Sequence, residues 1–159
     1  MAAAAIAQTD RLASRMTTGP EGRLGAVLAD VREAVVRYQI RVWDLNADSY
    51  CLKLDGKDPD NRFLSRFRPL RVRKSSSCRQ RRPRNLPKEF GLSSVVDKKT
   101  NKNAVVFDIG TVRWLRPRAE AEVEGGYYCG SLCMAGGTYH VVWDGRQWNV
   151  TGFAVQVQS

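Results

Sequence analysis

Apolar residues recur at helical spacing in one segment of the first third of the chain. Between Glu21 and Arg41 the residues at this spacing are Leu24, Val27, Leu28, Val31, Val35 and Tyr38. Residues three and four apart share one face of a helix, so these six form a single stripe. Charged residues such as Asp30, Arg32 and Glu33 occupy the opposite face. The pattern predicts one long surface helix with its apolar stripe turned inward.

Shorter elements follow the helix in the middle of the chain. Residues 50–54 are mostly apolar and are stopped by Asp55-Gly56, which is typical of a short strand. A helical turn is expected over residues 61–68, and a further strand starts near Val72. Residues 75–90 combine serine, arginine and proline, so we expect an exposed basic loop there.

Longer apolar and alternating runs fill the second half of the chain. They predict four strands over residues 104–115, 118–129, 138–143 and 146–158. The connections between them are short, which favours an antiparallel meander. In the second strand glutamates alternate with small apolar residues, so we expect the glutamates to face solvent. These residues are Glu120, Glu122 and Glu124.

The Asp144-Gly145 pair predicts the register of the last hairpin. This pair is preferred in two-residue type I′ turns, which would place Trp143 opposite Arg146. The same register puts His140 on the polar face, opposite Asn149. We therefore interpret His140 as a structural or exposed residue, because a catalytic role needs the right geometry first.

Together the elements predict an α+β fold. We expect one domain over residues 21–159, with one long N-terminal helix packed on a curled antiparallel sheet of about four to six strands. Of the 159 residues, 43% are hydrophobic and 26% are charged, as in ordinary globular domains. No apolar run approaches the roughly 18 residues that a membrane span needs. Residues 1–20 are interpreted as a flexible arm or a remnant of processing or cloning.

The order of these elements resembles the cystatin-like and NTF2-like α+β folds, in which long antiparallel strands curl around the first helix. Three pieces also resemble segments of small bacterial proteins of unknown function. They are residues 33–40, Lys57-Asp58-Pro59, and residues 127–133 followed by 139–148. Those proteins have no activity to transfer. The wider fold hosts enzymes, ligand carriers and interaction modules, so the resemblance implies a fold and not a function.

Basic residues are concentrated in one stretch. The formal net charge is +10, and residues 62–88 hold 11 of the 26 lysines and arginines. Such a stretch can bind a polyanion or nucleic acid, or it can be plain solubilising surface. The candidate contacts are Arg79, Arg81, Arg82 and Arg84. Because few aromatic residues are available for stacking, binding is expected to read phosphates and not bases.

Large aromatic residues form a second candidate site. Tyr38, Trp43, Trp114, Tyr139 and Trp148 can line a pocket for a small apolar ligand between helix and sheet. The alternative is that they pack the interior of the domain, which is the usual role of aromatics facing one another across a sheet.

The four cysteines bear on bonding and on location. Cys129 and Cys133 lie near a glycine-rich hairpin end, where a disulfide can form if the protein is exported, although strands that diverge would leave free thiols. A second ligand pair with zinc spacing is missing, so we expect no metal and no cofactor. Ala5-Ile6-Ala7 resembles the end of a secretory cleavage site. The sequence therefore leaves two hypotheses for the location of the protein. It is exported to the periplasm or medium, or it is cytoplasmic.

No motif in the chain specifies a reaction. Neither a nucleophile motif nor a phosphate-binding glycine loop is present, and spacing brings no carboxylate pair together. We therefore name no catalytic residue and favour a noncatalytic binding or interaction domain, with a protein or a small apolar ligand as partner. Polyanion binding through residues 62–88 is the first alternative. A small NTF2-like enzyme with its site in the cone between helix and sheet is the second.

Overall fold

The computed structural model describes residues 20–43, 45, 47–85, 87 and 91–159, with side chains from residue 25 onward. These residues form one long helix and a mixed, open sheet of eight strands. The predicted α+β class is confirmed, but the expected strand number was too low. Residues 1–19, for which an arm was predicted, lie outside the described residues. No described helix is long and apolar enough to cross a membrane.

Within the described residues the elements follow one another as two helices, a 3-10 turn and eight strands. Their bounds are α2 Pro20–Trp43, β1 Ser49–Leu54, α3 Asn61–Ser65, β2 Val72–Lys74, η1 Ser75–Ser77, β3 Cys78–Arg81, β4 Ser94–Asp97, β5 Ala104–Arg116, β6 Glu120–Gly130, β7 Cys133–Trp143 and β8 Trp148–Gln158. The long helix and the four long strands of the second half match the predicted elements.

The sheet is mixed, whereas an antiparallel sheet was predicted. Strands β5 to β8 are antiparallel neighbours, as the short connections between them require. Strand β1, however, is parallel to both β2 and β5. The chain leaves the end of β1, crosses through α3 and enters β2 in the original direction. A crossover of this kind produces parallel neighbours, and short-range spacing along the sequence does not reveal it.

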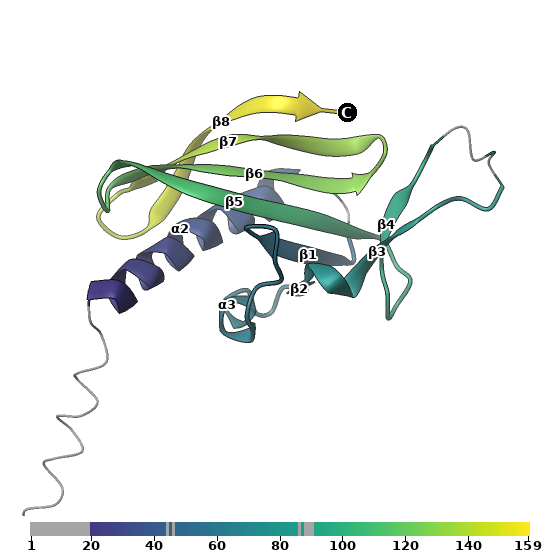
Figure 1. Cartoon of the computed structure of the whole chain (residues 1–159), viewed down its shortest axis with the longest axis horizontal. Coiled ribbons are helices and arrows are strands. Elements are labelled where there is room, and N and C mark those ends of the chain that lie inside the picture. Colours follow the sequence, from purple (N-terminus) through teal and green to yellow (C-terminus); the bar gives the residue numbers. More distant parts are fainter. Residues whose placement is uncertain (1–19, 44, 46, 86, 88–90) are drawn as a thin grey trace, which may run out of the picture.

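Helix α2 lies across the inner face of the long strands (Figure 1). Its stripe residues Val31 and Val35 have no exposed surface, and neither has Val36, which was not part of the predicted stripe. The stripe packs on Phe107, Val123 and Tyr139, which are also fully buried and come from β5, β6 and β7. Burying apolar side chains on this scale is the main stabilising contribution in a domain of this size. The predicted inward stripe is thus confirmed for Val27, Val31, Val35 and Tyr38.

Strands β3 and β4 pair with each other and form a ribbon that projects from the end of the sheet (Figure 1). The ribbon joins the sheet at a single pair, Ser94 with Gly130. Its residues Cys78 and Val95 are buried against the sheet face that points away from α2. The predicted loop over residues 75–90 was therefore wrong in its first half. The chain there is a 3-10 turn and then a strand, because β4 supplies a distant pairing partner.

The last hairpin has a different register from the predicted one. Trp143 pairs with Trp148, so the loop between the strands has four residues and not two. The Asp144 carboxylate accepts the backbone N–H groups of Arg146 (2.8 Å) and Gln147 (2.9 Å), and this side-chain turn replaces the tight type I′ turn. His140 consequently lies opposite Gly152 instead of Asn149, but it remains on the polar face.

The polar face of the meander is held by charge pairs. His140 Nε2 lies 2.6 Å from a Glu120 carboxylate oxygen, and Arg116 pairs with the same carboxylate. Arg113 pairs with Glu122. The predicted glutamate stripe therefore lies on the polar face, where Glu120 and Glu122 are ion-paired and Glu124 is exposed, with buried Ala121 and Val123 turned inward.

Both cysteine pairs are at disulfide distance. Cys129 and Cys133, the predicted pair, have Cα atoms 5.2 Å apart. Cys51 and Cys78 were not predicted to pair, and their Cα atoms are 6.2 Å apart. The second pair is visible only in three dimensions, since it joins β1 to the start of the ribbon. Two such pairs suggest an oxidising compartment and an exported protein.

Val31→Asp should unfold most of the protein at ambient temperature. The charge would enter fully apolar surroundings, and the expected loss is about 4 kcal/mol or more, which is comparable to total stability. Val42→Asp on the same helix is the matched control, because Val42 is 46% exposed. Thermal melts followed by circular dichroism measure both. Equal melting temperatures for the two variants would contradict the helix-on-sheet packing.

The two disulfides should differ in their contribution to stability. Cys51 and Cys78 are 27 positions apart, whereas Cys129 and Cys133 are 4 apart. Closing the longer loop removes more entropy from the unfolded chain, by about 1.5 kcal/mol at 25 °C. We expect the double alanine variant of the first pair to be less stable than that of the second by this amount, in urea unfolding without reductant. A reversed order would show that loop closure does not decide their contributions.

Candidate functional site

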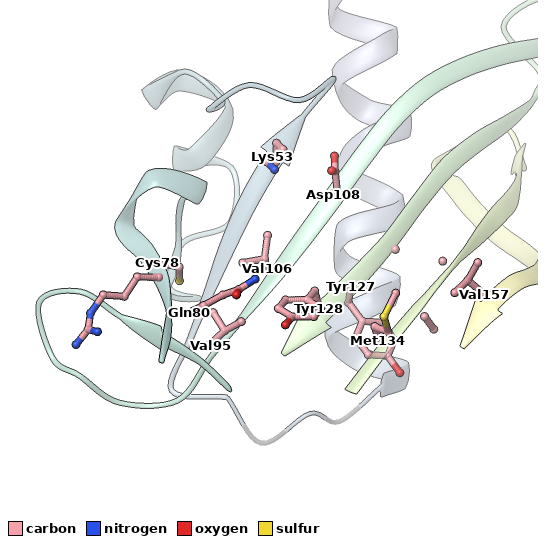
Figure 2. A pocket seen from close by; sticks show the side chains of 14 residues that line it. Lys53, Cys78, Gln80, Val95, Val106, Asp108, Tyr127, Tyr128, Met134 and Val157 are labelled. Carbon is pink, nitrogen blue, oxygen red and sulfur yellow. The ribbon is translucent and has the colours of Figure 1, made fainter. Parts of the chain in front are cut away.

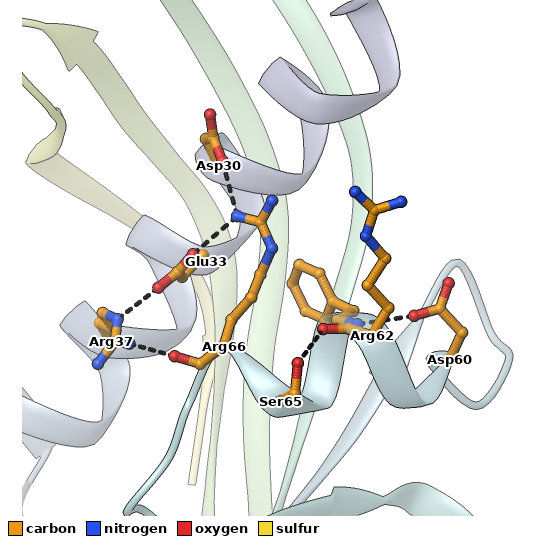
Figure 3. Close-up of polar contacts among 8 residues, drawn as sticks. Asp30, Glu33, Arg37, Asp60, Arg62, Ser65 and Arg66 are labelled. Atoms are coloured by element: carbon orange, nitrogen blue, oxygen red, sulfur yellow. Dashed lines mark hydrogen bonds and ion pairs between the residues drawn. The ribbon is translucent and has the colours of Figure 1, made fainter. Parts of the chain in front are cut away.

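The basic segment contains arginines that are already engaged in the fold. Arg66 donates to Asp30 at 2.6 Å and to Glu33 at 2.9 Å, and Arg37 donates to the Arg66 carbonyl oxygen at 2.6 Å (Figure 3). The hydrogen bond with Asp30 raises the pKa of Arg66 above its usual value. These contacts attach α3 to α2. Arg66 is therefore committed to structure and is not a candidate for ligand contact.

A second engaged arginine anchors the base of the ribbon. Arg73 lies 3.1 Å from a carboxylate oxygen of Asp97, which is only 1% exposed. The other Asp97 oxygen accepts the N–H groups of Thr100 (3.0 Å) and Lys99 (2.8 Å). The hydrogen bond from Thr100 is the largest cause that holds the pKa of Asp97 below its usual value. Asp97 therefore stays ionised and connects β2 with β4.

The 3-10 turn before the ribbon has its own anchor. Asp58 Oδ1 accepts the Ser75 hydroxyl at 2.6 Å and the Ser76 backbone N–H at 3.0 Å. The Ser75 hydrogen bond is the largest cause that lowers the pKa of Asp58 to about 2. The ribbon thus starts from a turn that an ionised carboxylate stabilises.

Four arginines of the ribbon lie around one hollow with a volume of about 690 Å³. They are the four candidates from the sequence, and four neutral residues complete the lining. The full set is Arg79, Gln80, Arg81, Arg82, Pro83, Arg84, Ser94 and Asn101. We call this surface the arginine hollow. Arg79 donates to the Asn101 side-chain oxygen at 3.0 Å. The fold therefore brings all four predicted residues to one place.

The charge of the arginine hollow is not compensated within the described residues. None of its lining residues is acidic, and none of the four arginines takes part in an ion pair among the side chains that the structure describes. Asp97 lies close by in sequence, but it is buried and bound to Arg73. Guanidinium groups are planar forks of donors that match phosphate, sulfate and carboxylate oxygens. The hollow is equipped to bind anions.

Aromatic stacking residues are missing from the described part of the hollow. Phe63 and Phe67, the nearest candidates from the basic segment, are 7% and 0% exposed and pack in the main core. Phe90, the third candidate, lies outside the described residues. The described side chains can hold charged oxygens but offer no flat surface for bases, which agrees with contacts that are blind to sequence.

A second cleft, of about 580 Å³, lies on the sheet face that points away from α2. We call it the outer cleft; its floor consists of Val95, Val106, Tyr128, Met134 and Val157. Figure 2 shows these side chains in front of the sheet, with α2 behind it, and with Lys53 and Asp108 at one end. The sequence did not predict this cleft, because its five floor residues come from five different strands. The sequence pattern that could have indicated the cleft is the alternation along β5, where Val106 points outward between inward Val105 and Phe107.

The five aromatic pocket candidates occupy other positions. Tyr139 is fully buried, stacks on Phe153 with centroids 4.3 Å apart and meets the edge of Tyr38. The Gln39 side-chain amide donates to the Tyr139 hydroxyl at 2.9 Å. Burial raises the pKa of Tyr139.

The three tryptophan candidates also make aromatic contacts. Trp43 packs on Tyr127 and Phe153, and Trp114 packs on Trp148. None of the five candidates lines the arginine hollow or the outer cleft. Tyr139 and Trp148 belong to the main core, and Tyr38 and Trp114 pack against it. Trp148 also lines a smaller hollow of about 320 Å³ together with residues of α2.

Groups that could support catalysis or bind metal are dispersed. His140 is occupied by Glu120 and Thr151, whose Oγ1 lies 2.8 Å from Nδ1. Asp108 is exposed at the rim of the outer cleft, in register with Lys53. Within the described ranges, no group of three or more histidine, cysteine or acidic residues could hold a metal ion.

Comparison with known proteins found no matching family model, curated protein or solved structure.

The Asp58 anchor should give the protein a specific sensitivity to acid. Its folded pKa of about 2 lies below the unfolded value of 3.8, so its contribution is present above pH 3.8 and is lost as the pH falls toward 2. The stability difference between the parent and Asp58→Asn should therefore narrow between pH 5 and about pH 2. Urea unfolding across this range measures it.

Ser75→Ala provides the comparison for Asp58. It removes one of the two donors to the carboxylate and leaves the Ser76 N–H in place. Its stability difference from the parent should narrow in the same direction, but by less. Parallel stability profiles for all three proteins would contradict the role of Asp58 as an ionised anchor.

Proposed function

We propose that this protein is a noncatalytic binding domain that holds polyanions in the arginine hollow. One observation carries the proposal: four arginines surround a single hollow, and no described carboxylate pairs with them. Arginines that serve only the fold look different in this protein, since Arg66 and Arg73 each have acidic partners. The positive charges of unpaired guanidinium groups repel one another, and this repulsion raises the free energy of the folded protein. A bound anionic ligand offsets the repulsion.

The polyanion would be read through its charged oxygens. The described hollow has guanidinium, hydroxyl and amide groups but no aromatic platform, so contacts fall on phosphates or sulfates. Nucleic acid of any sequence fits this description. Lys98, Lys99 and Lys102, in the turn after β4, extend the basic surface beside the hollow.

Support for a binding role over an enzymatic one comes from the cone between helix and sheet. In NTF2-like enzymes this cone would hold the acid–base groups. Here Val35, Phe107 and Tyr139 fill it without exposed surface, and Gln39 is the buried polar residue that meets Tyr139. Amide and phenol groups bonded to each other in an apolar core are poor proton carriers at neutral pH.

We also propose a distant relationship to the cystatin-like and NTF2-like folds. The support is the long helix in the concavity of an antiparallel meander formed by β5 to β8. The parallel pairing of β1 with β2 and β5, and the projecting ribbon, are additions to that plan. Because the arginine hollow lies on the ribbon, the proposed binding function depends on an addition and not on the shared core.

Replacing Arg79, Arg81, Arg82 and Arg84 by serine should flatten the salt dependence of DNA binding. Each phosphate contact contributes about −0.9 to the slope of log K against log salt, so the slope should fall in magnitude by up to about 3.6. Fluorescence anisotropy with random-sequence duplex and single strands, measured over a salt series, determines the slope. The parent should bind different sequences with equal affinity.

A second quadruple variant controls for net charge. Arg113→Ser, Arg116→Ser, Arg118→Ser and Arg146→Ser together remove the same formal charge from β5 and from the turns after β5 and β7, which lie outside the ribbon. It should leave most of the slope intact, because these residues do not line the hollow. No binding of the parent at low salt, or equal slopes in both variants, would exclude the arginine hollow as the polyanion site.

A further inference from the structure

The arginine hollow and the outer cleft adjoin each other at strand β3. Both are lined by Arg79 and Gln80, which are exposed residues of that strand. The remaining lining residues differ in their main chemistry. Those of the hollow are mainly arginines, whereas those of the cleft are mainly apolar, with Val106, Tyr128 and Met134 on the floor. A cationic surface thus continues directly into an apolar one.

The outer cleft has the size and lining of a ligand site. Its volume of about 580 Å³ lies within the range of about 300–1,000 Å³ that is usual for small-molecule sites. Val157 is 54% exposed on the floor, although β8 offers polar residues at neighbouring positions. Exposed apolar groups that line a concave surface are typical of binding sites, whereas single exposed apolar groups on a convex surface are not informative.

The polar groups of the outer cleft lie at its ends. The Tyr128 hydroxyl is bonded to Ser93 Oγ at 2.8 Å, so the ring faces the cleft while its polar atom is satisfied by the ribbon. Lys53 and Asp108 stand in register at the end away from the arginines and offer opposite charges to each other. Arg79 at the other end has Asn101 as its neutral partner. The net charge that a ligand meets is therefore positive, and it is concentrated at the ribbon.

We propose that the outer cleft binds the apolar chain of an amphiphile whose anionic head is held by Arg79 at the edge of the arginine hollow. The ligand class is a single alkyl or acyl chain with a carboxylate, sulfate or phosphate head. Charge complementarity selects this occupant, because a neutral apolar molecule leaves the adjoining arginines unused and a cationic amphiphile is repelled by them. The inference rests on the proposed function in one respect only, namely that Arg79 contacts an anion.

Titration calorimetry with dodecanoate below its micelle concentration tests this proposal on the full chain. Octanoate varies the chain length, and dodecyltrimethylammonium keeps the chain but reverses the head charge. Affinity should rise by up to about fourfold per added methylene while the cleft is being filled. The cationic amphiphile should bind at least about tenfold more weakly than dodecanoate.

Two pairs of variants locate the chain and the head. Val157→Glu should weaken dodecanoate binding by about fivefold or more, whereas Val155→Glu should not, because Val155 is similarly exposed at 50% on the same strand but does not line the cleft. Arg79→Gln should weaken it by about five- to tenfold, and Arg146→Gln should leave it unchanged, since Arg146 lines neither the outer cleft nor the arginine hollow.

The outcomes separate this proposal from the polyanion function. Equal binding of both amphiphile charges, or parental affinity of Val157→Glu for dodecanoate, overturns the amphiphile site. Absence of dodecanoate binding while DNA binding persists also overturns it and leaves the polyanion function standing. If dodecanoate binds with the expected dependence on Val157 and Arg79 while DNA does not bind at low salt, the amphiphile site holds and the polyanion function falls.

Discussion

The packing of the α2 stripe into the sheet concavity is the constraint on which the other features depend. Val31, Val35 and Val36 are buried against side chains from β5, β6 and β7, and this contact decides which face of every strand is inner. Because side chains alternate along a strand, each outer position follows from an inner one. Val106 points to the outer face because Val105 and Phe107 point to the inner one. The position of Val106 on the floor of the outer cleft follows from this alternation.

The ribbon packs on the sheet face that the helix leaves uncovered. It crosses the end of β6 at Gly130, where a Cβ atom would overlap the Ser93 carbonyl oxygen, so the backbones approach as closely as they do only because this residue is glycine. Asp97 and Asp58 hold its base from two sides. The arginines beyond the base are left to face solvent. Rigid attachment therefore coexists with an unpaired cationic surface, which is the combination that a preorganised binding site requires.

Local patterns predicted the parts of the fold that depend on local physics. The stripe of α2 and the glutamate alternation of β6 follow from side-chain periodicity, and both are observed. The parallel pairing of β1 and the existence of β4 depend on partners distant in sequence, which spacing does not encode. The same division applies to the site. Charge clustering indicated the four arginines, but their meeting in one hollow beside an apolar cleft depends on how the ribbon lies on the sheet.

The different burial of the two disulfides has a consequence for redox chemistry. Thiol–disulfide exchange needs direct access of a thiolate to a sulfur atom. Cys51 has no exposed surface and Cys78 has 8%, whereas Cys129 and Cys133 are only half-buried at the turn between β6 and β7. A reductant therefore reaches the turn in the native protein but meets the ribbon bond only after local opening. Mild reducing conditions that already cleave the Cys129–Cys133 bond therefore leave the Cys51–Cys78 bond, which joins the ribbon to β1, intact.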